Sequence, residues 1–115
     1  MSLDGPLTRK SVLDQAAAVV LKNREAQYGS PEDSFGTIAE FWTTFLRRRG
    51  VLAEGKALTS AEVAALMALL KLARIGETID HSDSIVDLAG YAACLGELSS
   101  QVKGALDTDN KRESI

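Results

Sequence analysis

Two aspartates, Asp83 and Asp87, stand one helical turn apart in the segment "DHSDSIVDLAGYAACLGEL", residues 80–98. Asp83 is accounted for as an acid in the first turn of a helix, whereas Asp87 lies between Val86 and Leu88, where the pattern predicts core. Like charges at this spacing share a helix face and repel each other. The two carboxylates therefore require a cation nearby.

Two kinds of cation could meet this requirement. A metal could lie between the carboxylates, and because the chain has one cysteine and one histidine, it would be a hard cation held by oxygen, such as Mg²⁺ or Mn²⁺. Alternatively, Lys71 and Arg74, three residues apart in the preceding apolar segment, could pair with the aspartates as a structural ion cluster between two helices. The residues alone leave both interpretations open.

Three further polar residues are candidates for the same site. Glu62 follows Thr59 at the spacing of a capping box, which would account for it structurally, but it could also serve as a third carboxylate. Arg24, in "NREAQYG", fits either the solvated end of a helix or a phosphate-binding role, and Tyr28 fits either a corner residue packed on the end of the bundle or a substrate-binding role.

Such a set of residues matches the chemistry of a polyphosphate site. Carboxylates hold Mg²⁺, the metal bridges phosphate oxygens, lysine and arginine neutralise the remaining charge, and a carboxylate positions the attacking water. The chain has neither a Walker-type glycine loop nor a GxGxxG motif. A phosphate site would therefore be built from the side chains of helices.

Caps and glycine stops predict four helices to carry these residues: Ser11 to about Tyr28, Ser30 to Gly50, Thr59 to Gly76, and about 81–103. The third helix contains "VAALMALLKLARI" and is apolar on all sides except at Lys71 and Arg74. A helix of this kind belongs in the middle of a bundle, where it is the most buried element. The fold class we expect is all-α, an antiparallel four-helix bundle.

Length and charge narrow the function further. The 115 residues suit one domain, with an N-terminal extension at 1–10, a helical domain at 11–103 and a disordered tail at 104–115. The net charge of −3 argues against direct nucleic-acid binding. No apolar run is long enough for a membrane span or a signal region, so we expect a cytoplasmic protein without membrane contact. Because three companion helices would leave the third one incompletely covered, we also expect a homo-oligomer.

Four motifs carry a resemblance to a known family. "NREAQYGSPEDSF", "AEFW", "EVAALMALLKLARI" and "DSIVDLAGYAA", in this order within residues 11–98, resemble small all-α proteins of unassigned activity that are encoded mainly by bacteriophages and prophages. That family is similar to the MazG-like nucleoside triphosphate pyrophosphohydrolases. These hydrolyse NTPs or dNTPs to the monophosphate and pyrophosphate with Mg²⁺ held by helix carboxylates, usually as dimers or larger assemblies.

The resemblance implies a MazG-like bundle that binds a nucleotide with Mg²⁺ as cofactor. It implies metal ligation by Asp83 and Asp87. The implied catalytic residues are Glu62, Asp83 and Asp87, and the implied substrate-binding residues are Arg24, Tyr28, Lys71 and Arg74.

The chain also departs from the MazG-like pattern. It lacks the E-x-x-E of those enzymes, and its later acids read D-x-x-x-D in place of E-x-x-D. The expected function is therefore Mg²⁺-dependent nucleotide binding, with hydrolysis of a nucleoside triphosphate as the activity to look for. The alternative is a non-catalytic, oligomeric helical protein of phage origin that acts in interaction or regulation and whose charged cluster is structural.

Overall fold

The structure is a computed structural model that describes residues 6–23 and 30–106. All regular structure in these two ranges is helical, as expected for the all-α class, and it contains no strand. The elements are α1 (Arg9–Ala18), a π-helical turn η1 (Val19–Asn23), α3 (Pro31–Arg48), α4 (Ser60–Glu77) and α5 (Ser82–Leu106).

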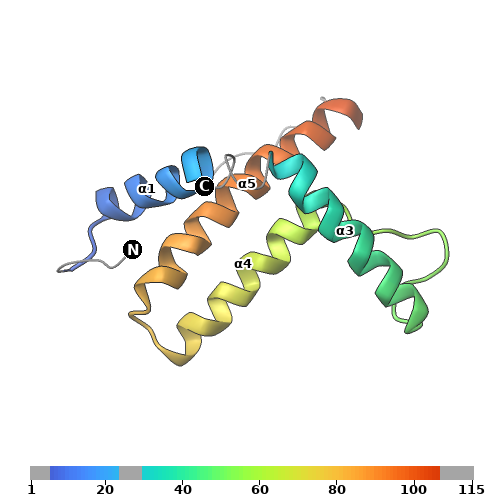
Figure 1. Ribbon diagram of the computed structural model, residues 1–115, viewed down its shortest axis with the longest axis horizontal. Helices are drawn as coiled ribbons and strands as arrows, with labels where there is room; N and C mark the ends of the chain where they lie inside the picture. The colour runs from blue at the N-terminus through green and yellow to red at the C-terminus, as the bar shows by residue number, and fades with distance from the viewer. Residues whose placement is uncertain (1–5, 24–29, 107–115) are drawn as a thin grey trace.

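The helix α5 is the centre of the arrangement. Helices α4 and α5 form an antiparallel hairpin, α1 lies along α5, and α3 meets the N-terminal part of α4 and then diverges from it (Figure 1). The radius of gyration is 16.0 Å, compared with about 13 Å for a compact domain of this length. The four helices are therefore more open than a closed bundle.

Short-range hydrogen bonds start the helices where the sequence predicts. The Ser30 side chain accepts a hydrogen bond from the backbone N–H of Asp33, and Pro31 takes the first position of α3. The end of α3 leads into Gly50, whose φ of 75° lies in the left-handed region that favours glycine. Helix α1 begins two residues before the predicted Ser11, because Thr8 is the N-cap and Ser11 is the third helical residue of its capping box.

The capping box of α4 gives a direct test of this local control. The Thr59 side chain accepts from the backbone N–H of Glu62 at 3.1 Å, and the Glu62 carboxylate accepts from the backbone N–H of Thr59 at 2.9 Å. Thr59→Ala is expected to lower the free energy of unfolding by about 1 kcal/mol. Thr37→Ala is the matched control, since Thr37 is an exposed residue within α3, where alanine has the higher helix propensity. Urea unfolding should separate the two variants, and equal effects would contradict the capping role.

A small core joins α3, α4 and α5. Its buried members are Phe35, Ala39, Val63, Ala64, Cys94 and Leu98. The ring of Phe35 lies 6.1 Å from that of Tyr91 at an interplanar angle of 41°, a favourable tilted arrangement for two aromatic rings. The core thus lies at the end of the hairpin where α3 crosses it.

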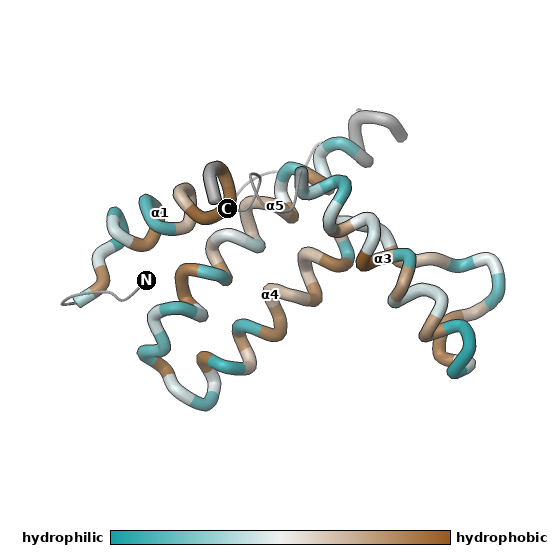
Figure 2. The backbone as a smooth tube through the Cα atoms, viewed as in Figure 1, coloured by the Kyte–Doolittle hydropathy of each residue, from teal (hydrophilic) through white to brown (hydrophobic). Residues whose placement is uncertain are grey.

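The prediction that the third helix is the most buried is wrong. Apolar residues run through most of α4 (Figure 2), but only Val63 and Ala64 of this helix are buried. Four of its leucines are between 42% and 58% exposed: Leu66, Leu69, Leu70 and Leu72. The reason is that α1 packs on α5, so that among the elements that the structure describes α4 is contacted by α5 along one side and by α3 near its own N-terminus.

The C-terminal limit of the helical domain differs slightly from the predicted one. Helix α5 continues to Leu106, a little beyond the predicted end at 103. The remainder of the predicted tail, 107–115, lies outside the described residues. Of the helices that the structure describes, none has the length and hydropathy needed to span a membrane.

Candidate functional site

Lys71 and Asp87 form an ion pair between α4 and α5. The Lys71 Nζ lies 3.0 Å from the Asp87 Oδ2, and the two side chains are 15% and 36% exposed. Asp87 therefore occupies an apolar stretch of α5 because the facing helix supplies a cation. The pair also fixes the register of the hairpin, with residue 71 opposite residue 87.

The second aspartate and the second cation remain at the surface. Asp83 and Arg74 are both exposed, and neither takes part in an ion pair within the ranges that the structure describes. Asp83 lies one turn before Asp87 on α5, and Arg74 lies one turn after Lys71 on α4, so both are near the established pair. Four of the predicted site residues thus gather on one stretch of the hairpin.

Glu62 does not belong to this group. It lies nine residues before Lys71, which in an antiparallel hairpin brings it level with Gly96 on α5. The distance from Asp83 along the helix axis is then about 20 Å at a rise of ~1.5 Å per residue. Because its carboxylate caps the backbone of Thr59, we interpret Glu62 as a capping residue.

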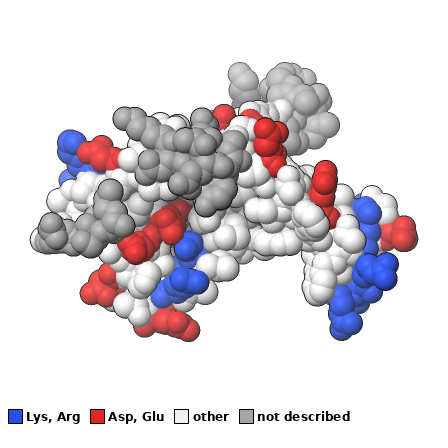
Figure 3. Space-filling view, in the orientation of Figure 1, with Lys and Arg blue, Asp and Glu red and all other residues white. Residues whose placement is uncertain are grey.

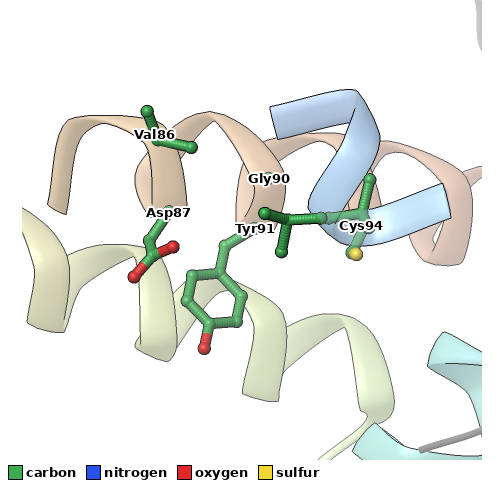
Figure 4. A pocket seen from close by; sticks show the side chains of 7 residues that line it. Val86, Asp87, Gly90, Tyr91 and Cys94 are labelled. Carbon is green, nitrogen blue, oxygen red and sulfur yellow. The ribbon is translucent and has the colours of Figure 1, made fainter. Parts of the chain in front are cut away.

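A small cavity lies beside Asp87, between α5 and η1. Its volume is about 80 Å³, several times what one water molecule requires at ~15 Å³. It is lined by Val19, Val20, Val86, Asp87, Gly90, Tyr91 and Cys94. The side chains of Asp87 and Tyr91 point to the same side of α5, toward α4, whereas Val86 points to the other side (Figure 4).

The wall of this cavity opposite α5 is the π-helical turn η1, which the sequence did not predict. A Cβ added at Gly90 would lie 3.0 Å from the Val20 Cγ1, closer than carbon atoms normally pack. Gly90 therefore allows η1 to approach α5, and π-turns occur frequently at functional sites. The glycine within the helical pattern "DLAGYAA" was the available signal for this contact.

The predicted substrate-binding residues Arg24 and Tyr28 lie outside the described residues, which stop at the end of η1 and resume at Ser30. In the sequence, Arg24 comes directly after η1, and Tyr28 comes four residues after Arg24.

A larger hollow between α3 and the loop before α4 is a weaker candidate. Its volume is about 580 Å³, but its polar groups are largely used within the chain. The buried Thr43 hydroxyl accepts from the Leu58 N–H at 2.9 Å, and the Arg47 guanidinium donates to the Lys56 carbonyl. None of the five predicted site residues that the structure describes lines it.

The number of acidic residues near Asp87 decides what kind of metal site is possible. Within residues 6–23 and 30–106, no group of three or more histidine, cysteine or acidic residues could hold a metal ion. Mg²⁺, however, is commonly bound by one or two carboxylates, with water and substrate phosphates completing its coordination. Asp83 and Asp87 fit that limited role and do not fit a metal site made entirely by protein.

Comparison with known proteins identifies the family. Residues 11–99 match the model of a domain of unknown function, DUF6378. The chain belongs to this family. The matched residues include η1 and also Lys71, Arg74, Asp83 and Asp87, which we call the Lys71–Asp87 site.

Relatives of this DUF6378 chain include two mycobacteriophage proteins. It is 35% identical over 86 residues to the Gene 55 protein of Mycobacterium phage D29, and this match covers 75% of the chain and 52% of that protein. It is 34% identical over 88 residues to the Gene 55 protein of Mycobacterium phage L5, covering 76% of the chain and 52% of the relative. The chain thus spans about half the length of these relatives. No solved structure matches it.

Proposed function

We propose that this DUF6378 protein binds a nucleotide together with Mg²⁺ at the Lys71–Asp87 site. Binding is the core of the proposal. The reaction to be tested there is that of the MazG-like enzymes, in which water and a nucleoside triphosphate give the monophosphate and pyrophosphate.

The observation that carries the proposal is the convergence of charge and space at Asp87. The Lys71 Nζ approaches the Oδ2 of Asp87, and Asp87 is also one of the residues that line the cavity between η1 and α5. Asp83 and Arg74 are exposed and lie one turn away along α5 and α4, so two carboxylates and two cations occupy the same stretch of the hairpin. A purely structural ion pair needs neither the cavity nor the two exposed partners.

In this proposal each charged residue of the site has one role. Asp83 and Asp87 would hold Mg²⁺, which supplies neutralisation of the phosphate charge. Lys71 and Arg74 would bind phosphate oxygens, as lysine and arginine do at many phosphate sites. The cavity is smaller than the about 300–1,000 Å³ of a pocket that encloses a small-molecule ligand, so most of the nucleotide would lie outside it.

Asp83→Asn tests this function without disturbing the fold. The wild-type chain should be stabilised by about 2.7 kcal/mol when a Mg²⁺-nucleotide is present at a hundred times its dissociation constant. In the variant this stabilisation should disappear, whereas the free energy of unfolding without ligand should fall by only about 0.3–1 kcal/mol, the contribution of an exposed acid in the first turn of a helix. The measurement is a thermal-shift panel of ribo- and deoxyribonucleoside triphosphates, each with and without Mg²⁺.

The matched control is Glu97→Gln, which neutralises an exposed acid on the same helix beyond the site. It should keep the ligand-induced stabilisation. Failure of every nucleotide to stabilise the wild-type chain would reject the proposal, as would equal effects of the two variants. Release of pyrophosphate from the stabilising nucleotide would identify hydrolysis.

A second candidate function is favoured by the Lys71–Asp87 contact itself. Because Lys71 neutralises the most buried acid of the cluster, the charges could serve only to lock α4 to α5. The protein would then be a non-catalytic interaction or regulatory protein of phage origin. This function predicts no stabilisation by any Mg²⁺-nucleotide in the same panel.

A further inference from the structure

Helix α3 carries two exposed aromatic rings on one face. Phe41 is 71% exposed and Phe45 is 62% exposed, and residues four apart on a helix are neighbours on its surface. The two positions are about 6 Å apart along the helix axis, at a rise of ~1.5 Å per residue. Arg48 follows Phe45 by three residues and is also exposed, so it continues the same face. We call Phe41, Phe45 and Arg48 the α3 stripe.

The core does not account for the two rings. The buried residues of α3 are Phe35, Ala39 and Thr43, which recur every four residues. Phe41 and Phe45 each lie two residues from Thr43 in the chain, and residues two apart on a helix do not share a face. The α3 stripe therefore lies on a side of the helix away from the core, where two large apolar rings remain in contact with solvent.

The stripe leads into a concentration of positive charge. Residues 47–56 contain one acid, Glu54, and four cations, which we call the basic cluster: Arg47, Arg48, Arg49 and Lys56. All four cations are exposed, and none forms an ion pair within the part of the chain that the structure describes. Lysine and arginine side chains gather at this end of the molecule in the space-filling view (Figure 3). The chain thus has a basic region despite its net charge of −3.

Hydrogen bonds hold the loop that completes the basic cluster. The Arg47 guanidinium donates to the Lys56 carbonyl, and the Leu58 N–H donates to the Thr43 hydroxyl at 2.9 Å. The loop after α3 is therefore folded back along the helix, with the backbone of Lys56 against Arg47. Because this arrangement exists before any ligand binds, less ordering is required when an anion is bound.

We propose that single-stranded nucleic acid binds to this side of α3, with bases stacked on Phe41 and Phe45 and phosphates on the basic cluster. Proteins that bind single strands without sequence preference combine aromatic rings, on which bases stack, with a positively charged surface that follows the backbone. The proposal concerns a surface separate from the Lys71–Asp87 site and does not depend on it. It differs from the expectation drawn from the net charge, because net charge averages over the whole chain.

Two other partners fit the surface less well. An amphipathic peptide helix binds by placing its apolar residues in a groove, but no residue of the α3 stripe lines either of the hollows described above. The C-terminal part of α3 also diverges from the hairpin (Figure 1). Double-stranded DNA keeps its bases paired and presents only their edges in its grooves, so it offers no base face to the two rings.

Fluorescence anisotropy of a labelled oligothymidylate with the full chain tests the stacking. EDTA is present, so that no divalent cation supports binding at Asp87. The wild-type chain should bind, and Phe45→Leu should bind about 5–150-fold more weakly, the equivalent of about 1–3 kcal/mol for the loss of one stacked base. Phe45→Tyr should bind like the wild type because it retains an aromatic ring. Leu13→Ala is the matched control, since Leu13 is 65% exposed on α1, and it should also bind like the wild type.

Salt dependence tests the basic cluster. If its four cations all contact phosphates, the logarithm of the binding constant should fall against the logarithm of the salt concentration with a slope of about −3, at ~−0.7 per contact for a single strand. Arg48→Gln should make this slope shallower by about 0.7. Arg9→Gln removes an exposed arginine of α1 and should leave the slope unchanged.

The outcomes that would overturn the proposal are specific. They are a Phe45→Leu variant that binds like the wild type, equal slopes for Arg48→Gln and Arg9→Gln, or a duplex of the same length bound as tightly as the single strand. An oligouridylate is tested beside the oligothymidylate, and the tighter of the two identifies RNA or DNA as the preferred strand. Absence of binding to both strands at protein concentrations up to about 0.1 mM, the weak limit of non-specific binding, would also reject the proposal.

Discussion

Phe35→Ala is expected to lower the free energy of unfolding by about 3–5 kcal/mol, the range for removing a phenylalanine from a core. Phe35 is 1% exposed, and its neighbours in the core come from α4 and α5 as well as from its own helix. Within the described residues, α3 crosses the hairpin at one end (Figure 1). Small domains have a total stability of about 5–15 kcal/mol, so this one substitution should remove a large part of it.

Urea unfolding at equilibrium measures this effect. The comparison is made at one protein concentration, so that any self-association affects both chains alike. Leu13→Ala serves as the control, because Leu13 is 65% exposed and its truncation should change stability by about 0.5 kcal/mol or less. If Phe35→Ala lowers the free energy of unfolding less than Leu13→Ala does, Phe35 does not belong to the core as the structure places it.

Asp87→Ala is expected to lower the free energy of unfolding of the ligand-free protein by about 1–3 kcal/mol. The substitution leaves the Lys71 ammonium, whose side chain is 15% exposed, without the carboxylate at 3.0 Å. The expected loss lies between the about 0–1 kcal/mol of a surface ion pair and the about 3–5 kcal/mol of a fully buried one. Lys71→Met should have the smaller effect, since Asp87 is 36% exposed and can remain hydrated.

A double-mutant cycle separates the ion pair from the other contacts of the two side chains. Lys71→Met combined with Asp87→Ala should be more stable than the sum of the single effects implies, with a coupling energy of about 0.5–3 kcal/mol. Urea unfolding without nucleotide or Mg²⁺ gives all four corners of the cycle. Additive effects, or an Asp87→Ala chain as stable as wild type, would mean that the pair contributes nothing and that Asp87 is present for a ligand alone.

The helix starts were predictable because their causes are local. Ser30 and Thr59 each accept a hydrogen bond from a backbone N–H three residues later, so the relevant partners are visible within a few letters of sequence. The start of α1 was placed at Ser11, whereas its N-cap is Thr8. Both residues carry a hydroxyl, and both take part in the same capping box. Local chemistry there permitted two neighbouring starts.

The candidate site was predictable in its residue types but not in its pairings. Sequence spacing showed that Asp87 needed a cation and that Lys71 and Arg74 were available. The choice of Lys71 depended on the register of α4 against α5, which is set by packing between residues far apart in the chain. Glu62 was grouped with the aspartates on its charge, and the antiparallel direction of the hairpin moved it to the other end.

The sequence by itself thus determined the helical class, the approximate helix limits and the set of charged residues, because caps, glycine stops and periodicity act over a few residues. Only the tertiary structure decided that α5, and not α4, is central, that Gly90 receives η1, and that the leucines of α4 remain exposed. An apolar helix has the same pattern whether it is covered by its own chain or by another. Its burial depends on where the neighbouring helices pack, and no local interaction in the sequence specifies that.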